Sequence, residues 1–285
     1  MVRYFNIILF SFIILFPNMG LAGWVGPVAV IVETWGSANN QIGLEVSESG
    51  DILPEGFWIL NNKIIIRDQI NKRMKIYNIA GQFERSVDWV KQQNGIYKIN
   101  EYPLAGLTVG YGGDNIYTYF PTRKSYIIYS SSGSLLQTLA VKPSELGVIK
   151  STKRNVDGGV SIVIQYGDAV FNINLPKLLE YFVRDLSGYL YGVIITGTPG
   201  NQHYSVYKYN KSGKALGIVD LPARNVIVEP ETVPARPTPE YTVVADYGKP
   251  VIAPNGDVYT WKRTPDKYAI LKWTWVDDAK ESKEL

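Results

Sequence analysis

The chain has 285 residues, of which 29 are Lys or Arg and 26 are Asp or Glu. Nucleic-acid-binding proteins hold phosphates with a strongly basic face, and the small positive surplus of this chain does not indicate one. We therefore expect no nucleic-acid partner. The chain has no cysteine and a single histidine, which excludes disulfides and zinc sites built from Cys and His.

The first 22 residues have the layout of a secretory signal peptide. Arg3 supplies the positive charge, an apolar stretch runs over Tyr4–Phe16, and Gly20 and Ala22 are the small residues of a cleavage site before Gly23. A membrane-spanning helix needs about 20 apolar residues, so this shorter stretch predicts cleavage and a periplasmic or secreted protein. The alternative is an uncleaved N-terminal helix that anchors the protein, which is the only membrane contact the sequence predicts.

Residues 23–277 are predicted to form a single all-β domain, followed by a charged tail at residues 278–285. Short apolar segments that alternate with period two favour strands, as does the abundance of Tyr and Trp. Leu175–Val183 is the one segment that fits a short helix, and a strand explains Tyr181–Val183 equally well. The expected strands include Lys63–Arg67, Arg73–Ile79, Asn115–Phe120, Ser125–Tyr129, Gly159–Gln165, Tyr204–Tyr209, Asp257–Lys262 and Ala269–Trp275.

A turn recurs along the chain, four residues after a strand aromatic residue. The three pairs are Tyr77 with Gly81, Tyr129 with Gly133, and Tyr209 with Gly213. In all three copies a similar strand precedes the strand that carries the aromatic residue. In the third copy, six residues within Thr196–His203 look inserted between these two strands. Repeats of about 40–50 residues with four strands each are typical of β-propellers.

The repeat predicts a propeller of six four-stranded blades, with five or seven left open by the insertions. A propeller ring closes when its first and last strands share a blade, so Val28–Trp35 is predicted to share a blade with Ala269–Trp275. Residues 222–240 carry five prolines, which remove hydrogen-bond donors from a strand ladder. This segment is expected to be an excursion between blades or a loop along an edge, either a variable surface loop or a functional one.

The first copy of the repeat contains the pattern Asp68-x-x-Asn71-x-Arg73, then the strand Met74–Asn78 and the turn residue Gly81. This pattern resembles the repeat of the NHL family of β-propellers, whereas the later copies keep only the strands and the turn. The resemblance implies that the Asp, Asn and Arg order a tight turn between inner strands. The chemistry agrees, since Asp and Asn cap turn amides and Arg can return to the carboxylate. A ligand role for these three side chains is the alternative.

The sequence offers few candidates for catalysis. His203 is the only histidine, and no Gly-x-Ser-x-Gly turn accompanies it. No cofactor is predicted, and the one metal left open is Ca²⁺ held by acidic and amide oxygens at the axis of the ring. The candidate ligands, most of which glycine turns also explain, are Glu55, Asp114, Asn155, Asp157, Asp185 and Asn255.

Several aromatic residues occupy comparable positions in successive repeats. They are expected to pack between blades, and a platform for ligand stacking is the alternative. They are Trp58, Tyr117, Tyr119, Tyr191 and Trp261.

These observations predict an exported, monomeric, non-enzymatic propeller that binds an unknown protein or small ligand through its rim loops. A rigid scaffold with many loops suits that role. The alternative is a Ca²⁺-type metal-dependent hydrolase or lactonase with an axial Asp, Glu and Asn site. A purely structural domain is the third hypothesis.

Overall fold

The structure is a computed structural model, and every element in its described part is a strand or a turn. None of the described segments is a helix that could cross a membrane. The described residues are 22–45, 54, 56–60, 62–88, 90–91, 97–98, 107–112, 115–120, 125–130, 135–140, 147–197, 202–223, 225–228 and 241–277.

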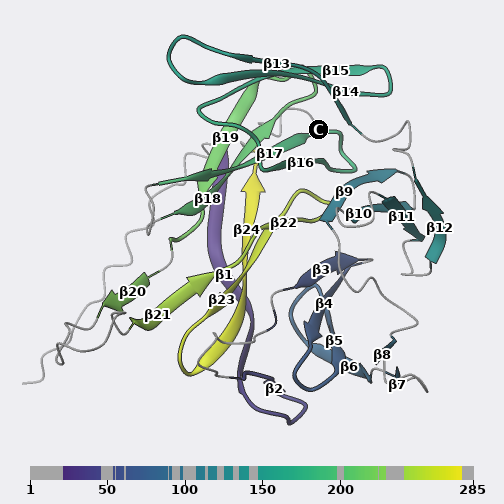
Figure 1. The fold of residues 1–285 in the computed structure, drawn as a ribbon, viewed down its shortest axis with the longest axis vertical. Helices are drawn as coiled ribbons and strands as arrows, with labels where there is room; N and C mark the ends of the chain where they lie inside the picture. Colours follow the sequence, from purple (N-terminus) through teal and green to yellow (C-terminus); the bar gives the residue numbers. More distant parts are fainter. Residues whose placement is uncertain are drawn as a thin grey trace, which may run out of the picture.

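The largest sheet joins the two ends of the domain. Its strand order is β2-β1-β24-β23-β21-β20, and the short β22 also pairs with β23. In Figure 1, β1 and β24 run side by side along the long axis, with Gly23 opposite Val276 and Thr34 opposite Lys267. The pairing predicted for the first and last strands is therefore present. The strands are β1 (Gly23–Trp35), β2 (Gln41–Ile42), β20 (Asn225–Val228), β21 (Tyr241–Tyr247), β22 (Val251–Ile252), β23 (Val258–Arg263) and β24 (Lys267–Val276).

Three further sheets are antiparallel up-and-down meanders of four strands each. The first comprises β3 (Phe57–Leu60), β4 (Lys63–Asp68), β5 (Arg73–Asn78) and β6 (Phe83–Asp88). The second comprises β9 (Leu107–Gly112), β10 (Asn115–Phe120), β11 (Ser125–Ser130) and β12 (Leu135–Leu139). The third comprises β16 (Tyr181–Arg184), β17 (Leu190–Thr196), β18 (His203–Tyr209) and β19 (Ala215–Asp220).

Two smaller sheets complete the described part. One lies across the top of Figure 1 and comprises β13 (Val148–Arg154), β14 (Val160–Tyr166) and β15 (Ala169–Leu175). The other pairs β7 (Val90–Lys91) with β8 (Tyr97–Lys98). The described part is thus an all-β assembly of small, mostly antiparallel sheets, and the numbers of strands described in them differ from the four expected for each blade.

Two segments that the sequence left ambiguous are now placed. Leu175 ends β15 and Tyr181 begins β16, so the strand and not the helix forms at Tyr181–Val183. Within the proline-rich segment, Asn225–Val228 forms β20, which pairs only with β21 and so occupies the edge of its sheet. An edge suits neighbouring prolines because no further ladder is required on that side.

The sequence repeat is visible in the strand register. The aromatic residue lies opposite the residue six positions later, across a register shift, in the three pairs Tyr77–Phe83, Tyr129–Leu135 and Tyr209–Ala215. In the third copy, the β17–β18 ladder extends to Thr196 opposite His203 before its loop begins. Part of the apparent insertion therefore lengthens two strands and is not confined to the loop.

One five-residue turn recurs at the ends of these strands. In each copy, the glycine at the fourth position donates its N–H to the carbonyl of the first residue, at 2.9–3.2 Å. The glycine has a φ of 82° to 86°, a left-handed conformation that strains any residue with a Cβ atom. The turns are Asn78–Gln82, Asn155–Gly159, Asp185–Tyr189, Asn210–Lys214 and Ala253–Asp257.

The core consists of three clusters between facing sheets. The first packs Ile31 of β1 and Ile270 of β24 against Ile64 and Ile66 of β4. The second packs the opposite side of β23 and β24 against β17 and β18, and the third packs β14 and β15 against β17 and β18. Alternate strand residues point to opposite faces, so a strand with a sheet on each side is apolar at successive positions.

The aromatic residues singled out from the sequence divide into two groups. Trp58, Tyr191 and Trp261 are buried, as packing between sheets requires. Tyr117 and Tyr119 lie on β10, whose side chains are outside the described part.

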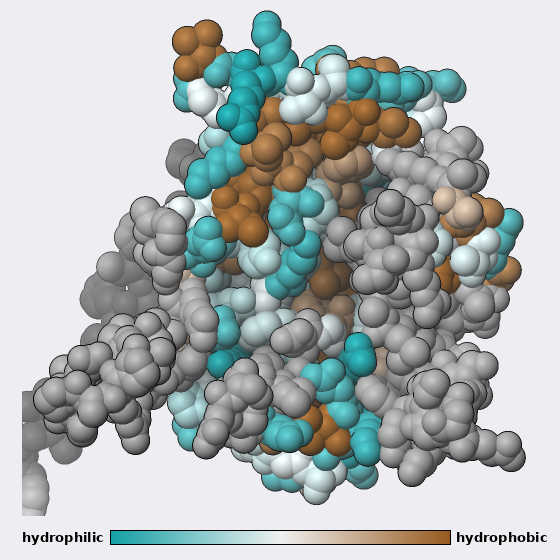
Figure 2. Space-filling view, in the orientation of Figure 1, coloured by the Kyte–Doolittle hydropathy of each residue, from teal (hydrophilic) through white to brown (hydrophobic). Residues whose placement is uncertain are grey.

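Figure 2 shows hydrophobic surface gathered where the β13–β15 sheet meets β17 and β19.

Candidate functional site

Asp68, Asn71 and Arg73 converge at the four-residue loop between β4 and β5. Arg73 Nε donates to Asp68 Oδ2 at 2.8 Å, and Asn71 Nδ2 donates to the same oxygen at 2.9 Å. The backbone N–H of Asn71 also donates to Asp68 Oδ1, at 3.4 Å. The carboxylate at the end of one strand thus receives donors from the loop and from the start of the next strand.

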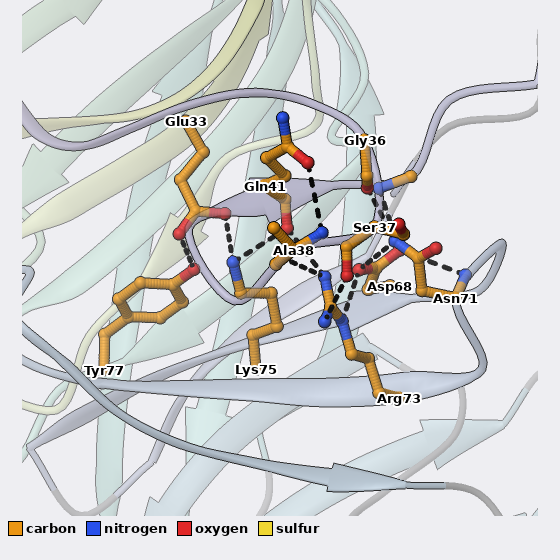
Figure 3. A network of polar contacts seen from close by, with 11 residues as sticks. Glu33, Gly36, Ser37, Ala38, Gln41, Asp68, Asn71, Arg73, Lys75 and Tyr77 are labelled. Carbon is orange, nitrogen blue, oxygen red and sulfur yellow. Dashed lines mark hydrogen bonds and ion pairs between the residues drawn. The ribbon is translucent and has the colours of Figure 1, made fainter.

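The same three side chains hold a second chain segment, the connection after β1. Arg73 donates to the backbone carbonyls of Ser37, Ala38 and Gln41 at 2.8–3.0 Å. Asn71 donates to the carbonyl of Gly36 at 2.8 Å, and the N–H of Gly43 donates to Asp68 Oδ1 at 3.0 Å. As Figure 3 shows, this polar network joins β4 and β5 to the β1–β2 connection.

A second set of charges continues the network along β5. Lys75 pairs with Glu33 of β1 and also donates to the carbonyl of Gln41 at 2.9 Å, and Tyr77 donates its hydroxyl to Glu33. Lys75 is fully buried and Glu33 is 7% exposed. Burial lowers the pKa of Lys75, against the opposing effect of Glu33, whereas burial and Glu33 both raise the pKa of Tyr77.

The polar network of Figure 3 balances its charges internally. Two carboxylates, Glu33 and Asp68, face two cations, Arg73 and Lys75, and each of the four side chains contacts other protein groups. Buried charges require such partners, since an unpaired one would carry a large desolvation cost. The arrangement therefore acts as an inter-strand clamp.

A second polar cluster lies between the β16–β19 sheet and the largest sheet, and Lys208 of β18 is its centre. Lys208 is 5% exposed, and its Nζ lies 4.4 Å from the ring centroid of Tyr189 and 4.7 Å from that of Trp275. The Tyr191 ring is 5.9 Å away, and Trp24 packs edge-on against Trp275 at 5.4 Å. Burial lowers the pKa of Lys208, and the electron-rich ring faces offset part of the desolvation of its charge.

Acidic residues at the neighbouring turns surround this lysine. Asp185 accepts the Tyr191 hydroxyl at 2.9 Å and the Tyr189 N–H at 2.8 Å, and its burial raises the pKa of its carboxyl group. Asp257 pairs with Lys272 at 2.7 Å. These bonds fix the turns Asp185–Tyr189 and Ala253–Asp257 at one end of the two sheets.

These two turns are in direct contact and present an apolar side chain to solvent. The N–H of Leu186 donates to the carbonyl of Pro254 at 3.0 Å. Asp185 is 4% exposed, whereas the next residue, Leu186, is 59% exposed. Val156 occupies the matching second position of the turn Asn155–Gly159 and is fully exposed, but that turn borders the other end of β17, at Ile195. The two turns therefore display an aliphatic side chain at this end of the sheets, and we call their shared surface the turn rim (Leu186 and Pro254).

The proposed metal ligands do not form a cluster in the described part. Asp157 accepts the Gly159 N–H at 3.0 Å within its own turn, and Asn155 accepts the Ser161 hydroxyl at 2.9 Å. Asn255 donates to Asp257 at 2.9 Å. No group of three His, Cys, Asp or Glu side chains that could hold a metal ion occurs among the described residues, and Glu55 and Asp114 lie outside them.

The other residues predicted to matter are placed as follows. His203 Nε2 lies 2.9 Å from the Thr196 hydroxyl, across the end of the β17–β18 hairpin. Gly81 and Gly213 occupy their five-residue turns with φ of 85° and 82°, and Gly133 lies outside the described residues. Ala22 precedes β1 directly, and Gly23 is its first residue.

Sequence reasoning missed Glu33, Lys75 and Lys208. A lysine flanked by apolar or aromatic residues within a strand is the signal that could have found Lys75 and Lys208, since such a position faces a core. The partners of these lysines lie on other strands, 42 residues away for Glu33 and Lys75, so spacing alone could not supply them.

No protein-family model matches the chain, and no curated protein matches it. Solved structures are similar only at low identity. The chain is 11% identical to a chain of Kuenenia stuttgartiensis hydrazine synthase, with a TM-score of 0.26, over 74% of this chain and 56% of that one, so it spans little more than half of that chain's length.

Two other solved structures match over more of their own length. A catalytically inactive virginiamycin B lyase from Staphylococcus aureus, solved with quinupristin, is 13% identical, with a TM-score of 0.24, over 85% of this chain and 82% of that one. A member of the DUF4221 family from Bacteroides vulgatus is 11% identical, with a TM-score of 0.25, over 84% of each chain. These likenesses are too weak to place the chain in a family.

Proposed function

We propose that the protein is an exported β-propeller that acts as a non-enzymatic scaffold and binds a partner protein at its turn rim. The propeller is supported by the recurring turn and strand register and by the pairing of β1 with β24. Export is supported by the layout of residues 1–22. Binding is supported by the geometry of the turns.

The observation that carries the binding proposal is the contrast between Asp185 and Leu186. Asp185 is buried and bonded to Tyr189 and Tyr191, which holds the turn rigid, while Leu186 extends into solvent at 59% exposure. An aliphatic side chain on a rigid backbone can be buried by a partner with little loss of conformational entropy. Removing such a side chain from water contributes about 2 kcal/mol to association.

A substitution at the turn rim tests this proposal. Tagged full-length protein would be cross-linked in the cell envelope of its native host, and the captured proteins would be quantified by mass spectrometry. Leu186→Asp places a charge at the proposed contact, so we expect it to remove at least one protein that the wild type captures.

Val32→Asp is the matched control, because Val32 is an exposed aliphatic residue, 55% accessible, and lies opposite Ala269 near the start of β24. The turn Ala253–Asp257 lies beside the other end of β24, where Val258 is opposite Trp273. The control should capture the same proteins as the wild type. If Leu186→Asp and Val32→Asp capture identical sets, the turn rim is not the binding surface.

Export can be tested separately from binding. The mass and N-terminal sequence of the protein recovered from its host should show a chain that begins at Gly23. A chain that retains residues 1–22 would instead support the uncleaved anchor, and the binding test would be unaffected.

A further inference from the structure

A cavity of about 360 Å³ lies between the β13–β14 turn and the connection from β15 to β16. Val160 at the start of β14, Leu178 in the connection and Ile195 of β17 provide its apolar lining. Val160 is 2% exposed, whereas Leu178 is 54% exposed. The cavity therefore has an apolar wall at its base and an aliphatic side chain at its mouth.

Two cations without ion-pair partners among the described residues border the same cavity, Arg154 at the end of β13 and Lys177 in the connection. Glu180 also borders it, and its carboxylate pairs with Lys249 at 2.9 Å. With Glu180 neutralised, Arg154 and Lys177 leave a local surplus of two positive charges. Cations beside an apolar wall favour a ligand that combines negative charge with an apolar chain.

The shape of the charged groups narrows the ligand further. A guanidinium presents a planar pair of N–H donors that matches the two oxygens of a carboxylate. Arg154 and Lys177 come from different chain segments but border the same cavity, so both cations face the space that a carboxylate at its mouth would occupy. The volume falls at the lower end of the range for small-molecule sites, which suits a short acyl chain rather than a folded domain.

We infer that this cavity, the Arg154–Lys177 cavity, binds a small amphipathic carboxylate, with its anionic group at Arg154 and Lys177 and its apolar chain against Val160, Leu178 and Ile195. The site goes beyond the scaffold function proposed above. It shares no residue with the contact at Leu186, so either proposal can fail without the other.

Octanoate is a suitable probe because it has one carboxylate and a short apolar chain. Titration of the full-length protein, followed by amide chemical shifts, should give saturable changes centred on Val160, Leu178 and Ile195. We expect a Kd of about 1 mM or tighter. Octylammonium, which has the same chain and the opposite charge, should bind at least about fivefold more weakly.

Two substitutions and a matched control test the assignment of the charges. Arg154→Gln and Lys177→Gln should each weaken octanoate binding at least about fivefold, the effect of losing one charge-assisted hydrogen bond. Lys153→Gln removes an adjacent exposed lysine that faces the other side of β13, and it should change the Kd less than about twofold. All three side chains are exposed, so thermal unfolding should confirm that the variants remain folded.

Three results would overturn the inference. The first is no saturable shift up to about 10 mM octanoate, which corresponds to a binding free energy too small for a specific site. The second is an equal loss of affinity in Lys153→Gln, which would indicate general electrostatic attraction. The third is equal binding of octylammonium, which would leave only the apolar wall as the source of affinity.

Discussion

Arg73 and Asp68 form an ion pair at 2.8 Å within one hairpin, and both also bond the backbone of a different connection, residues 36–43. The side chains are 8% and 0% exposed, so the pair is nearly free of solvent. A local turn motif thereby becomes a link between β4, β5 and the end of β1.

Arg73→Lys should destabilise the protein although it retains the positive charge. A lysine nitrogen cannot reach Asp68 and the carbonyls of Ser37, Ala38 and Gln41 together, so buried acceptors lose their donors. We expect the free energy of unfolding, measured with urea, to fall by about 2–4 kcal/mol. Lys63→Met is the control, because it breaks only the exposed Lys63–Glu84 pair and should cost less than about 1 kcal/mol. Similar losses in both variants would contradict the role of the buried network.

Two glycines with the same backbone conformation should respond differently to alanine. Gly81 and Gly158 both have a φ of 85°, but a Cβ atom on Gly81 would lie 1.7 Å from the carbonyl oxygen of Val30, whereas nothing lies within 4 Å at Gly158. Gly158→Ala should cost only the left-handed strain, about 1–2 kcal/mol, and Gly81→Ala about 3–5 kcal/mol. Both losses can be measured by urea unfolding, and a larger loss at Gly158 would show that the turn at Gly81 is not packed on β1.

Lys208 should contribute more by its aliphatic chain than by its charge. The ring contacts with Tyr189 and Trp275 offset part of the desolvation of the ammonium group, and an apolar residue of similar length has no such cost. We expect the free energy of unfolding of Lys208→Met to lie within about 1 kcal/mol of the wild-type value. That of Lys208→Ala should be lower by about 2–3 kcal/mol because packing is lost. Tryptophan fluorescence during denaturation would report both. Equal losses would show that the charge is the main contribution.

The protein should lose stability steeply above pH 10. Burial raises the pKa of Tyr77, Tyr191 and Tyr268, while tyrosine in an unfolded chain ionises near pH 10. Above that pH the folded chain binds more protons than the unfolded one, so each tyrosine lowers the free energy of unfolding by up to about 1.4 kcal/mol per pH unit. The lowered pKa values of Lys75 and Lys208 act in the opposite direction, but their effect is complete near pH 10.4.

Urea midpoints between pH 8 and pH 11.5 would measure this decline. Tyr77→Phe removes one of the groups, so its stability should fall less steeply with pH than that of the wild type, even if it is lower at pH 8. A decline of the same slope in the variant would show that Tyr77 ionises normally in the folded protein.

The sequence predicted features whose causes are local. The turns at Gly81 and Gly213 follow from the preference of Asn and Gly for their backbone conformations, so the spacing to Tyr77 and Tyr209 sufficed. The pairing of β1 with β24 joins distant segments, but topology predicted it, because a propeller ring closes when its first and last strands share a blade. The ion pair between Asp68 and Arg73 is likewise within reach of a five-residue separation.

The features that the sequence did not predict depend on contacts between distant segments. The bonds from Arg73 to Ser37–Gln41 span 32 to 36 residues, and the ring of Trp275 that approaches Lys208 belongs to a strand of another sheet, β24. The strand numbers of the sheets were also missed, because Asn225–Val228 adds to an existing sheet while the β13–β15 sheet has three strands among the described residues. Neither outcome leaves a periodic signal in the residues concerned.

The pairing of β1 with β24 has a consequence for how the protein is made. The strand β1 leaves the ribosome before all the other sheets, but its partner, Lys267–Val276, is translated only after them. At typical synthesis rates the interval is roughly 12 to 50 s. The largest sheet therefore assembles only after Lys267–Val276 has been made, so β1 stays without this partner while the intervening sheets are synthesised.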